Sequence, residues 1–359
     1  MSAPRLEISL DQIQHNAKAM VDCLGLRSIT VTAVTKSVLG MPDVARALLD
    51  AGVSGLGDAR VENLERMRAA GITAPLTLIR APMMSQVERV VRVADVSLNT
   101  EVATIGRLSA VADRLGVVHG VILMVELGDL REGILAEDLP LVAEQVLGLP
   151  GIELRGIGTN LACQSGVVPD EAKMAELSAL ASSLETSLGI SLPITSGGTS
   201  ANLSWALSGA DPGRVNDLRL GEAILLGREP LHRREIPNLS TDAITLVAEV
   251  IEAKRKPTMP WGDRAQGAFG VVAPTEDRGL AERAILALGV QDVDPASLQP
   301  PPGITIVGAS SDHLVVESPT PLRVGQMVRF GLGYGALLRA MTSPFVESVV
   351  QGHDDHGNR

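Results

Sequence analysis

A lysine, Lys36, lies directly after an apolar segment of strand length. Lys36 follows residues 29–35 (ITVTAVT), which have the length and the Val- and Thr-rich composition of a buried strand. An amine at such a strand end is partly removed from water. This favours its neutral form and makes it a candidate nucleophile for a Schiff base with an aldehyde. The alternative is a lysine that extends from the strand end into solvent.

A segment rich in glycine and hydroxyl groups is suited to holding an anion. In residues 196–202 (SGGTSAN), two glycines are followed by the hydroxyls of Thr199 and Ser200, which precede a predicted helix at 201–208. Glycines such as Gly198 let the backbone curve. The backbone N–H groups at the helix start, with the hydroxyls of Thr199 and Ser200, would then form a cradle for a phosphate.

Polar residues end further apolar segments. Arg131 lies between two glycines in GDLREG (128–133), where it could bind a carboxylate; the alternative is an ion pair with one of its acidic neighbours. Asn160 and Cys163 lie in GTNLAC (158–163), where the alternative for the thiol is a small buried side chain.

Short apolar runs alternate with Ala-, Leu-, Glu- and Arg-rich stretches over the first two thirds of the chain, a pattern typical of parallel strands covered by helices. The predicted strands lie near 29–35, 53–56, 75–79, 94–98, 120–126, 152–157, 192–195 and 217–220. Eight strands predict a closed (β/α)8 barrel. A doubly wound open sheet is the alternative, but no Gly-x-Gly-x-x-Gly follows the first strand.

In a barrel, working residues lie at the carboxyl ends of the strands, and a phosphate is usually held by the loops after strands seven and eight. Lys36 and the 196–202 segment would therefore face the same mouth, as pyridoxal phosphate requires of an amine and an anion site. A sugar-phosphate aldolase is the alternative. Its lysine usually sits on a late strand, however, and it has no C-terminal β domain.

The pattern changes after residue 235, where short Val-rich segments alternate with Pro and Gly and indicate an all-β domain. These segments lie at 244–252, 304–307, 313–317 and 327–330. We predict an N-terminal strand (1–10) that joins this domain, a barrel (11–235), the β domain (236–350) and a flexible tail (351–359).

The composition excludes several functions. The 359 residues carry a net charge of −11 and contain only three Phe, two Trp and one Tyr, so we expect no nucleic-acid and no anionic-membrane partner. No apolar run is long enough to span a bilayer, and two cysteines form no disulfide framework. We expect a cytoplasmic protein without a metal site.

Together these segments resemble the fold-type III, alanine racemase-like enzymes that use pyridoxal phosphate, and within them the ornithine racemase branch. The matching stretches are AVTKSVLG (33–40), GDARVENL (57–64), GDLREGI (128–134), GIGTNLAC (156–163), SGGTSANL (196–203), LRLGEAILLG (218–227), AFG (268–270), AILALGVQDV (284–293) and GASSDHLVVE (308–317).

The resemblance implies a role for each matching residue. Lys36 would bind the cofactor aldehyde and act as one proton-transfer base, while Arg219 would face the pyridine nitrogen. Arg131 would orient the cofactor and the substrate carboxylate. The remaining cofactor residues would be Asn160, Ser196, Gly198, Thr199, Ser200 and Gly221. The resemblance also implies a head-to-tail homodimer in which the β domain of one subunit closes the barrel mouth of the other.

The chain departs from alanine racemases proper at the second base. The slot of their catalytic tyrosine holds Val290, and the lysine that precedes their arginine is Met124 here. Their tyrosines near the phosphate are replaced by Gly40 and Phe345. A racemase needs a proton donor on the face opposite the lysine, so another residue must supply it.

His313 is the predicted second base, because GASSDHL matches the partner loop that enters the site and histidine exchanges protons at neutral pH. The alternative is a strand residue bonded within its own domain. Cys163 is the second candidate, and Ser311 and Asp312 are predicted to contact substrate.

We predict racemisation of a basic amino acid such as ornithine or lysine, by Schiff base formation and two-base exchange of the α-proton. The side-chain ammonium would need a carboxylate, for which Asp58 is the first candidate, with Glu126 and Asp129 as others. The alternatives are a D-amino-acid lyase or decarboxylase on the same fold, or a non-catalytic protein that binds pyridoxal phosphate.

Overall fold

The protein is described from a computed structural model, which places residues 2–267, 269–270 and 276–352. The chain divides into two compact units, residues 11–240 and residues 1–10 with 241–359. The predicted boundary after 235 falls inside the first unit, because the backbone N–H of Ile236 donates to the carbonyl of Gly227 at 2.9 Å. Residue 268 of the AFG stretch and residues 353–359 of the predicted tail lie outside the described residues.

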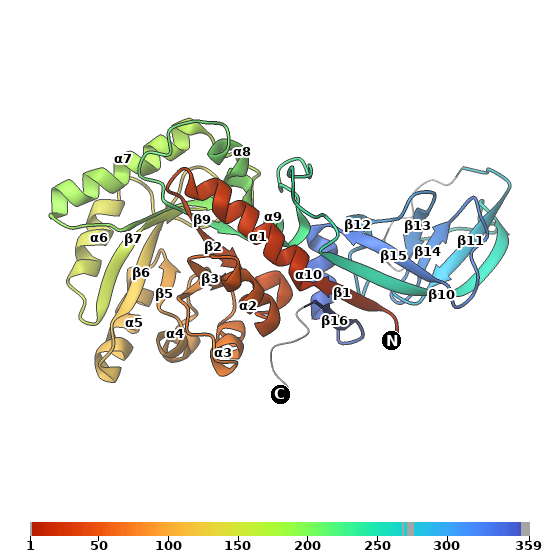
Figure 1. Cartoon of the computed structure of the whole chain (residues 1–359), viewed down its shortest axis with the longest axis horizontal. Coiled ribbons are helices and arrows are strands. Elements are labelled where there is room, and N and C mark those ends of the chain that lie inside the picture. The colour runs from red at the N-terminus through yellow and green to blue at the C-terminus, as the bar shows by residue number, and fades with distance from the viewer. Residues whose placement is uncertain (1, 268, 271–275, 353–359) are drawn as a thin grey trace. The chain divides into compact units, whose positions relative to one another are not determined.

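Eight parallel strands close into a barrel in the first unit, each hydrogen bonded to the next, with β9 returning to β2 (Figure 1). They are β2 (Thr30–Val34), β3 (Gly55–Asp58), β4 (Leu76–Leu78), β5 (Val96–Asn99), β6 (His119–Val125), β7 (Ile152–Thr159), β8 (Ile194–Thr199) and β9 (Asp217–Leu220). The predicted (β/α)8 barrel is confirmed, and each strand overlaps its predicted segment.

Helices lie outside these strands, as Figure 1 shows. They are α1 (Leu10–Gly25), α2 (Pro42–Asp50), α3 (Val61–Ala69), α4 (Val87–Val93), α5 (Val102–Leu115), α6 (Leu139–Leu147), α7 (Glu171–Leu188), α8 (Leu203–Ala206) and α9 (Glu222–Leu226), with 3-10 turns η1 (Lys36–Val38), η2 (Met84–Gln86) and η3 (Ser200–Asn202). The helix predicted at 201–208 is thus only η3 and α8. Helix α8 ends at Ala206, and just beyond it the Ser208 hydroxyl donates a hydrogen bond to the carbonyl of Trp205 at 2.8 Å.

The second unit is built on an antiparallel sheet in the order β12-β15-β10-β11-β14-β13. The N-terminal strand β1 (Arg5–Ser9) pairs antiparallel with β10 and parallel with β16. The other strands are β10 (Ile244–Pro257), β11 (Leu280–Leu286), β12 (Leu298–Gln299), β13 (Thr305–Ala309), β14 (Leu314–Glu317), β15 (Met327–Leu332) and β16 (Glu347–Gln351).

Two details of this unit correct the prediction. It is not all-β, because α10 (Tyr334–Thr342) follows β15 and buries an Ala- and Leu-rich face; η4 (Pro295–Ser297) is a further short turn. Strand β16 includes Gln351, the first residue of the predicted tail. Among the described residues, no helix has both the length and the apolar character needed to cross a bilayer.

Candidate functional site

Lys36 begins η1 directly after the carboxyl end of β2, and the neighbouring strand β3 fixes this turn. Asp58 at the end of β3 has no exposed surface and accepts the Thr35 hydroxyl at 2.7 Å. It also accepts the backbone N–H of Arg60 and the side-chain amide of Asn63, both at 2.9 Å. Asp58 therefore ties the turn that carries Lys36 to the next strand.

This environment gives Asp58 a structural role. Burial raises the pKa of its carboxyl, an effect that the hydrogen bonds from Thr35, Arg60 and Asn63 oppose. Its oxygens are bonded to protein donors and screened from solvent, so Asp58 holds the turn that carries Lys36. Its contact with substrate stays a prediction.

The two other candidate carboxylates also bond to backbone donors. Asp129 is buried, and its oxygens accept the N–H groups of Cys163, Gln164, Ser165 and Val167. Burial raises its pKa, but these four donors outweigh that effect and leave the pKa lowered. Glu126 accepts the N–H groups of Gly128 and Leu130 at 2.6 and 3.1 Å. Both side chains thus shape loops at the barrel mouth.

The loops after β8 and β9 meet at Ser200. Its buried hydroxyl accepts the backbone N–H of Gly221 at 3.3 Å and that of Ala223 at 3.2 Å. Gly221 in turn packs on β2, where a Cβ would lie 3.2 Å from the Cβ of Val34. The structure thus brings the predicted phosphate residues next to β2, the strand that precedes Lys36.

The curve of this cradle requires a glycine at 198. Gly198 has a φ of +141°, and a Cβ there would lie 2.1 Å from Oδ1 of Asn202. That oxygen instead accepts the backbone N–H of Thr199 at 3.0 Å, and the Thr199 hydroxyl accepts the N–H of Ala201 at 3.3 Å. These side-chain and backbone contacts hold residues 198–202 in a curved loop, and phosphate binding by this loop stays a prediction.

Arg219 lies inside the barrel with only 4% of its surface exposed. Its guanidinium donates to the carbonyl of Thr159 at 2.6 Å and to the Ser196 hydroxyl, which itself donates to Asp217. Burial lowers the pKa of Arg219, and the negative charge of Asp217 acts in the opposite direction. The Ser196 hydroxyl is therefore bonded on both sides to protein groups.

Asn160 has a buried amide nitrogen with no hydrogen-bond partner among the described residues. Its Oδ1 accepts the thiol of Cys163, an exposed residue, at 3.7 Å. Arg131 forms a two-pronged contact with its acidic neighbour Glu132, and this contact raises the pKa of Arg131; the carboxylate-binding role of Arg131 stays a prediction. A free amide donor, a glycine cradle and a buried cation at one barrel end fit a phosphate-bearing aromatic aldehyde.

His313 belongs to the second unit, in the turn between β13 and β14. Its Nδ1 lies 2.8 Å from Oδ1 of Asp312, which also accepts the Ser311 hydroxyl at 3.1 Å. The backbone N–H of Val290 donates to the carbonyl of Ser310 at 2.9 Å. The 310–313 turn is therefore bonded to Val290, the residue that the family resemblance predicts in place of a catalytic tyrosine.

The sequence interpretation missed two charged residues of the barrel. Asp217 lies two residues before Arg219 on β9, and the alternation of strand side chains was the signal that both face the interior. Glu222 follows Gly221, pairs with Arg233, and is 11% exposed. Burial raises its pKa, and the charges of Arg233 and Lys36 oppose this shift. The signal that could have identified Glu222 was its place in the LRLGEAILLG segment, just after the strand that pairs with the one preceding Lys36.

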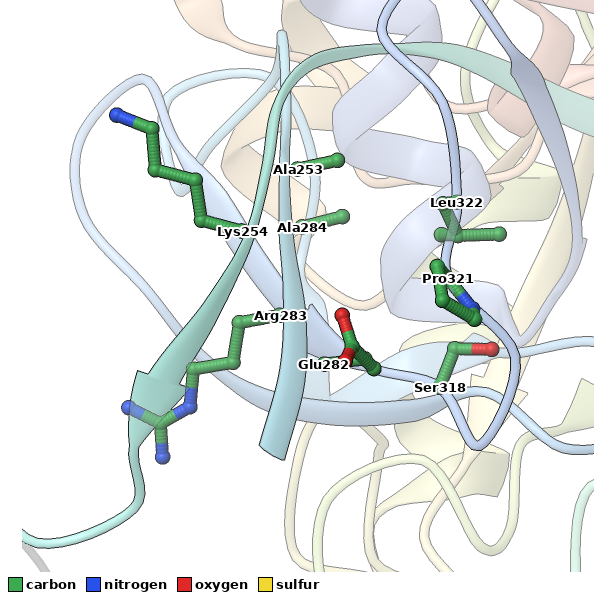
Figure 2. A pocket seen from close by; sticks show the side chains of 8 residues that line it. All are labelled: Ala253, Lys254, Glu282, Arg283, Ala284, Ser318, Pro321 and Leu322. Atoms are coloured by element: carbon green, nitrogen blue, oxygen red, sulfur yellow. The ribbon is translucent and has the colours of Figure 1, made fainter. Parts of the chain in front are cut away.

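Two concave spaces lie in the second unit, and none of the predicted site residues lines them. One measures about 50 Å³, too small for a cofactor; Figure 2 shows Ala253, Ala284 and Glu282 facing it while Lys254 and Arg283 extend to the other side of the strands. The other, about 500 Å³, is open and lined by arginines that have glutamate partners. Within the described ranges, no group of three or more His, Cys, Asp or Glu is arranged to hold a metal ion.

A barrel with a lysine after its first strand and a glycine cradle after its seventh, followed by an antiparallel domain, defines a class of enzymes that bind pyridoxal phosphate. Residues 8–229 match the family "Alanine racemase, N-terminal domain". The chain is 38% identical to the ornithine racemase of Acetoanaerobium sticklandii over 97% of this chain and 99% of the relative. The chain belongs to the alanine racemase family, whose members depend on pyridoxal phosphate.

A lysine racemase of Thermotoga maritima is also 38% identical, over 98% of this chain and 99% of that protein. Among solved structures, an alanine racemase from Clostridium difficile 630 has a TM-score of 0.74 at 20% identity and covers 99% of this chain and 97% of its own. A D-threonine aldolase from Filomicrobium marinum has the same TM-score at 15% identity, covering 95% and 88%. These likenesses show a shared fold.

Proposed function

We propose that this protein is a pyridoxal phosphate-dependent racemase of a basic amino acid, ornithine or lysine. The observation that carries the proposal is the position of Lys36 and the Ser200–Gly221 cradle at the same barrel end, in a chain that is similar over almost its whole length to an ornithine and a lysine racemase. We also propose that it acts in the cytoplasm.

In this proposal Lys36 holds the cofactor and takes or returns a proton at Cα of the substrate. Ser200 and Gly221 bind the phosphate, Asn160 donates its free amide N–H to the cofactor, and Arg219 faces the ring nitrogen. When bound, pyridoxal phosphate withdraws electrons from Cα and so weakens its bond to hydrogen. A buried cation at the ring nitrogen disfavours protonation of the ring, which suits reversible proton exchange rather than transamination.

The second proton comes from His313 of the partner subunit in a head-to-tail homodimer. Support for this assignment is the bond between the 310–313 turn and Val290, together with the carboxylate of Asp312 at the imidazole. Asp312 orients the ring, and Ser311 adds a hydroxyl near the substrate. Cys163 is the alternative base, because its thiol is exposed at the mouth of the barrel.

The proposal is tested by incubating the enzyme separately with each enantiomer of ornithine, lysine, alanine and serine, and following optical rotation and product identity. We expect ornithine or lysine to approach a racemic mixture from both sides, with alanine and serine slower. Release of carbon dioxide or an aldehyde would instead identify a decarboxylase or lyase. Racemisation should persist after dialysis against a chelator, whereas a metal-dependent lyase would lose activity.

A further inference from the structure

A continuous series of hydrogen bonds crosses the interior of the barrel through four strands. The Thr32 hydroxyl on β2 donates to Oδ1 of Asp217 on β9 at 2.7 Å. The Ser196 hydroxyl on β8 donates to the other oxygen of Asp217 and accepts a hydrogen bond from Nη1 of Arg219. Nη2 of Arg219 reaches the carbonyl of Thr159 on β7 at 2.6 Å.

The strand register explains why Ser196 can reach both charged groups. Asp217 and Arg219 are two residues apart on β9 and so point to the same side, while Leu218 and Leu220 between and beyond them are fully buried on the other. Ser196 is paired with Asp217 in the sheet, and the register then shifts so that Thr199 is paired with Arg219. The register shift at Gly197 and Gly198 directly follows Ser196, whose hydroxyl bonds to both Asp217 and Arg219.

The three side chains at the centre of this series of hydrogen bonds are buried, so the loss of any one of them leaves a polar partner without compensation. Asp217 is 8% exposed, Arg219 4% and Ser196 1%. A guanidinium in such surroundings needs a compensating negative charge, since an unpaired buried cation is strongly destabilising. Asp217 supplies this charge through one intervening hydroxyl, and in a dry site such an arrangement also fixes the direction of every hydrogen bond in it.

We propose that Asp217 is a positioning residue for Arg219, acting through the hydroxyl of Ser196. The inference rests on the proposed function, in which Arg219 faces the pyridine nitrogen of the cofactor. Asp217 offsets part of the guanidinium charge and holds its plane in one orientation, so it sets the field that the ring nitrogen experiences. Removing the carboxylate leaves the charge of Arg219 uncompensated and takes away the acceptor that orients the Ser196 hydroxyl, so the guanidinium is held less firmly by Ser196 and Thr159.

The experiment uses the full-length enzyme loaded with pyridoxal phosphate and the variants Asp217→Asn, Ser196→Ala and the double variant. Thr32→Val is the matched control, because it removes the other donor to Asp217 but leaves the link to Arg219. The readouts are the absorption and fluorescence spectra of the bound cofactor between pH 6 and 9, its dissociation constant, and kcat and KM separately.

We expect each single variant to shift the cofactor spectrum and to lower kcat by about ten- to a hundredfold, the usual effect of losing a group that orients a site residue, with a much smaller change in KM. The double variant should be no worse than the more damaging single variant, because both break the same connection. Thr32→Val should keep the wild-type spectrum. If Asp217→Asn fails to fold, Ser196→Ala breaks the link without removing a charge and decides the question.

Effects that multiply in the double variant would overturn the proposal. So would variants that unfold at a lower temperature but, when folded, show the wild-type spectrum and kcat, because Asp217 would then be purely structural. Failure of the proposed function is seen separately. If wild-type enzyme racemises no amino acid, the spectra still test Asp217; if Arg219→Lys has the wild-type spectrum, the role of Arg219 itself is wrong.

Discussion

The polar side chains of the barrel and those of the 310–313 turn differ in burial and in the number of their protein partners. In the barrel, Asp58, Asp217 and Arg219 are each less than one tenth exposed, and each has several protein partners. In the turn, the side chains of His313 and Asp312 are 43% and 57% exposed and bond to each other, and Asp312 also accepts the hydroxyls of Ser310 and Ser311. The polar groups of the barrel are buried and held by protein hydrogen bonds, whereas the side chains of the turn are about half exposed in the single chain.

Two histidines show the consequence of this difference. His119, at the start of β6, is buried and bonded to the Ser97 hydroxyl at 2.8 Å, and burial lowers its pKa to about 4, so it stays neutral. His313 is exposed beside a carboxylate that can orient either protonation state. A group that must exchange protons belongs in the second environment, whereas groups that hold a cofactor in one geometry belong in the first.

The largest expected effect concerns the barrel. Lys36→Ala should abolish the absorption band of lysine-bound cofactor and lower kcat/KM by at least about 10⁴-fold, since the amine both holds the cofactor and moves a proton. Absorption spectra of purified protein and a racemisation assay measure this. Lys18→Ala, which removes an exposed lysine paired with Asp22 on α1, is the control and should behave as wild type. An unchanged band in Lys36→Ala would remove the basis of the assignment.

The next effect concerns the 310–313 turn. His313→Asn should slow α-proton exchange by about 10²- to 10⁴-fold, the usual contribution of a general acid–base residue, and more from one enantiomer than from the other. The asymmetry is expected because Lys36 still serves the opposite face of Cα. Deuterium incorporation from heavy water into each enantiomer measures it.

The control for His313 is Cys163→Ala, tested in the same exchange assay. Near-wild-type exchange in Cys163→Ala together with the one-sided loss in His313→Asn assigns the second base to the histidine. A one-sided loss in Cys163→Ala, with His313→Asn unaffected, would assign it to the thiol instead. Equal losses from both enantiomers in either variant would speak against a two-base mechanism for that residue.

The same contrast explains how much the sequence could predict. The barrel strands were recognisable because continuous apolar runs of strand length are distinctive, and Lys36 and the SGGTSAN segment were singled out by their position at strand ends. The role predicted for Arg219 came from the family resemblance. The hydrogen bonds of Asp58 and Asp129 could not be predicted, because only the folded chain shows which backbone and side-chain donors bond to their carboxylate oxygens. Helix α10 was missed because its neighbours are short Val-rich segments that suggested a purely β unit.

A smaller effect is expected on stability in acid. His119 has a pKa of about 4 in the folded protein against about 6.5 in the unfolded chain, so the unfolded state binds more protons between these values. Its contribution to stability is complete above pH 6.5 and is lost as the pH falls toward 4, a change of about 3 kcal/mol in the free energy of unfolding. Denaturant unfolding at several pH values should show this slope in wild type and a shallower one in His119→Gln. Equal slopes would mean that His119 is protonated in the folded state.

The smallest effect is found by comparing the loss of a buried carboxylate, Asp58, with the loss of an exposed one, Asp312. Asp58→Ala leaves the Thr35 hydroxyl, the Arg60 N–H and the Asn63 amide without their buried acceptor, which should lower the free energy of unfolding by about 1–3 kcal/mol and loosen the turn that carries Lys36. Asp312→Ala removes an exposed acceptor and should leave stability unchanged while slowing exchange through His313. Denaturant midpoints and the deuterium assay together separate these outcomes. Equal losses of stability in the two variants would contradict the division between buried polar groups in the barrel and exposed ones in the turn, because a solvated carboxylate can be replaced by water and a buried one cannot.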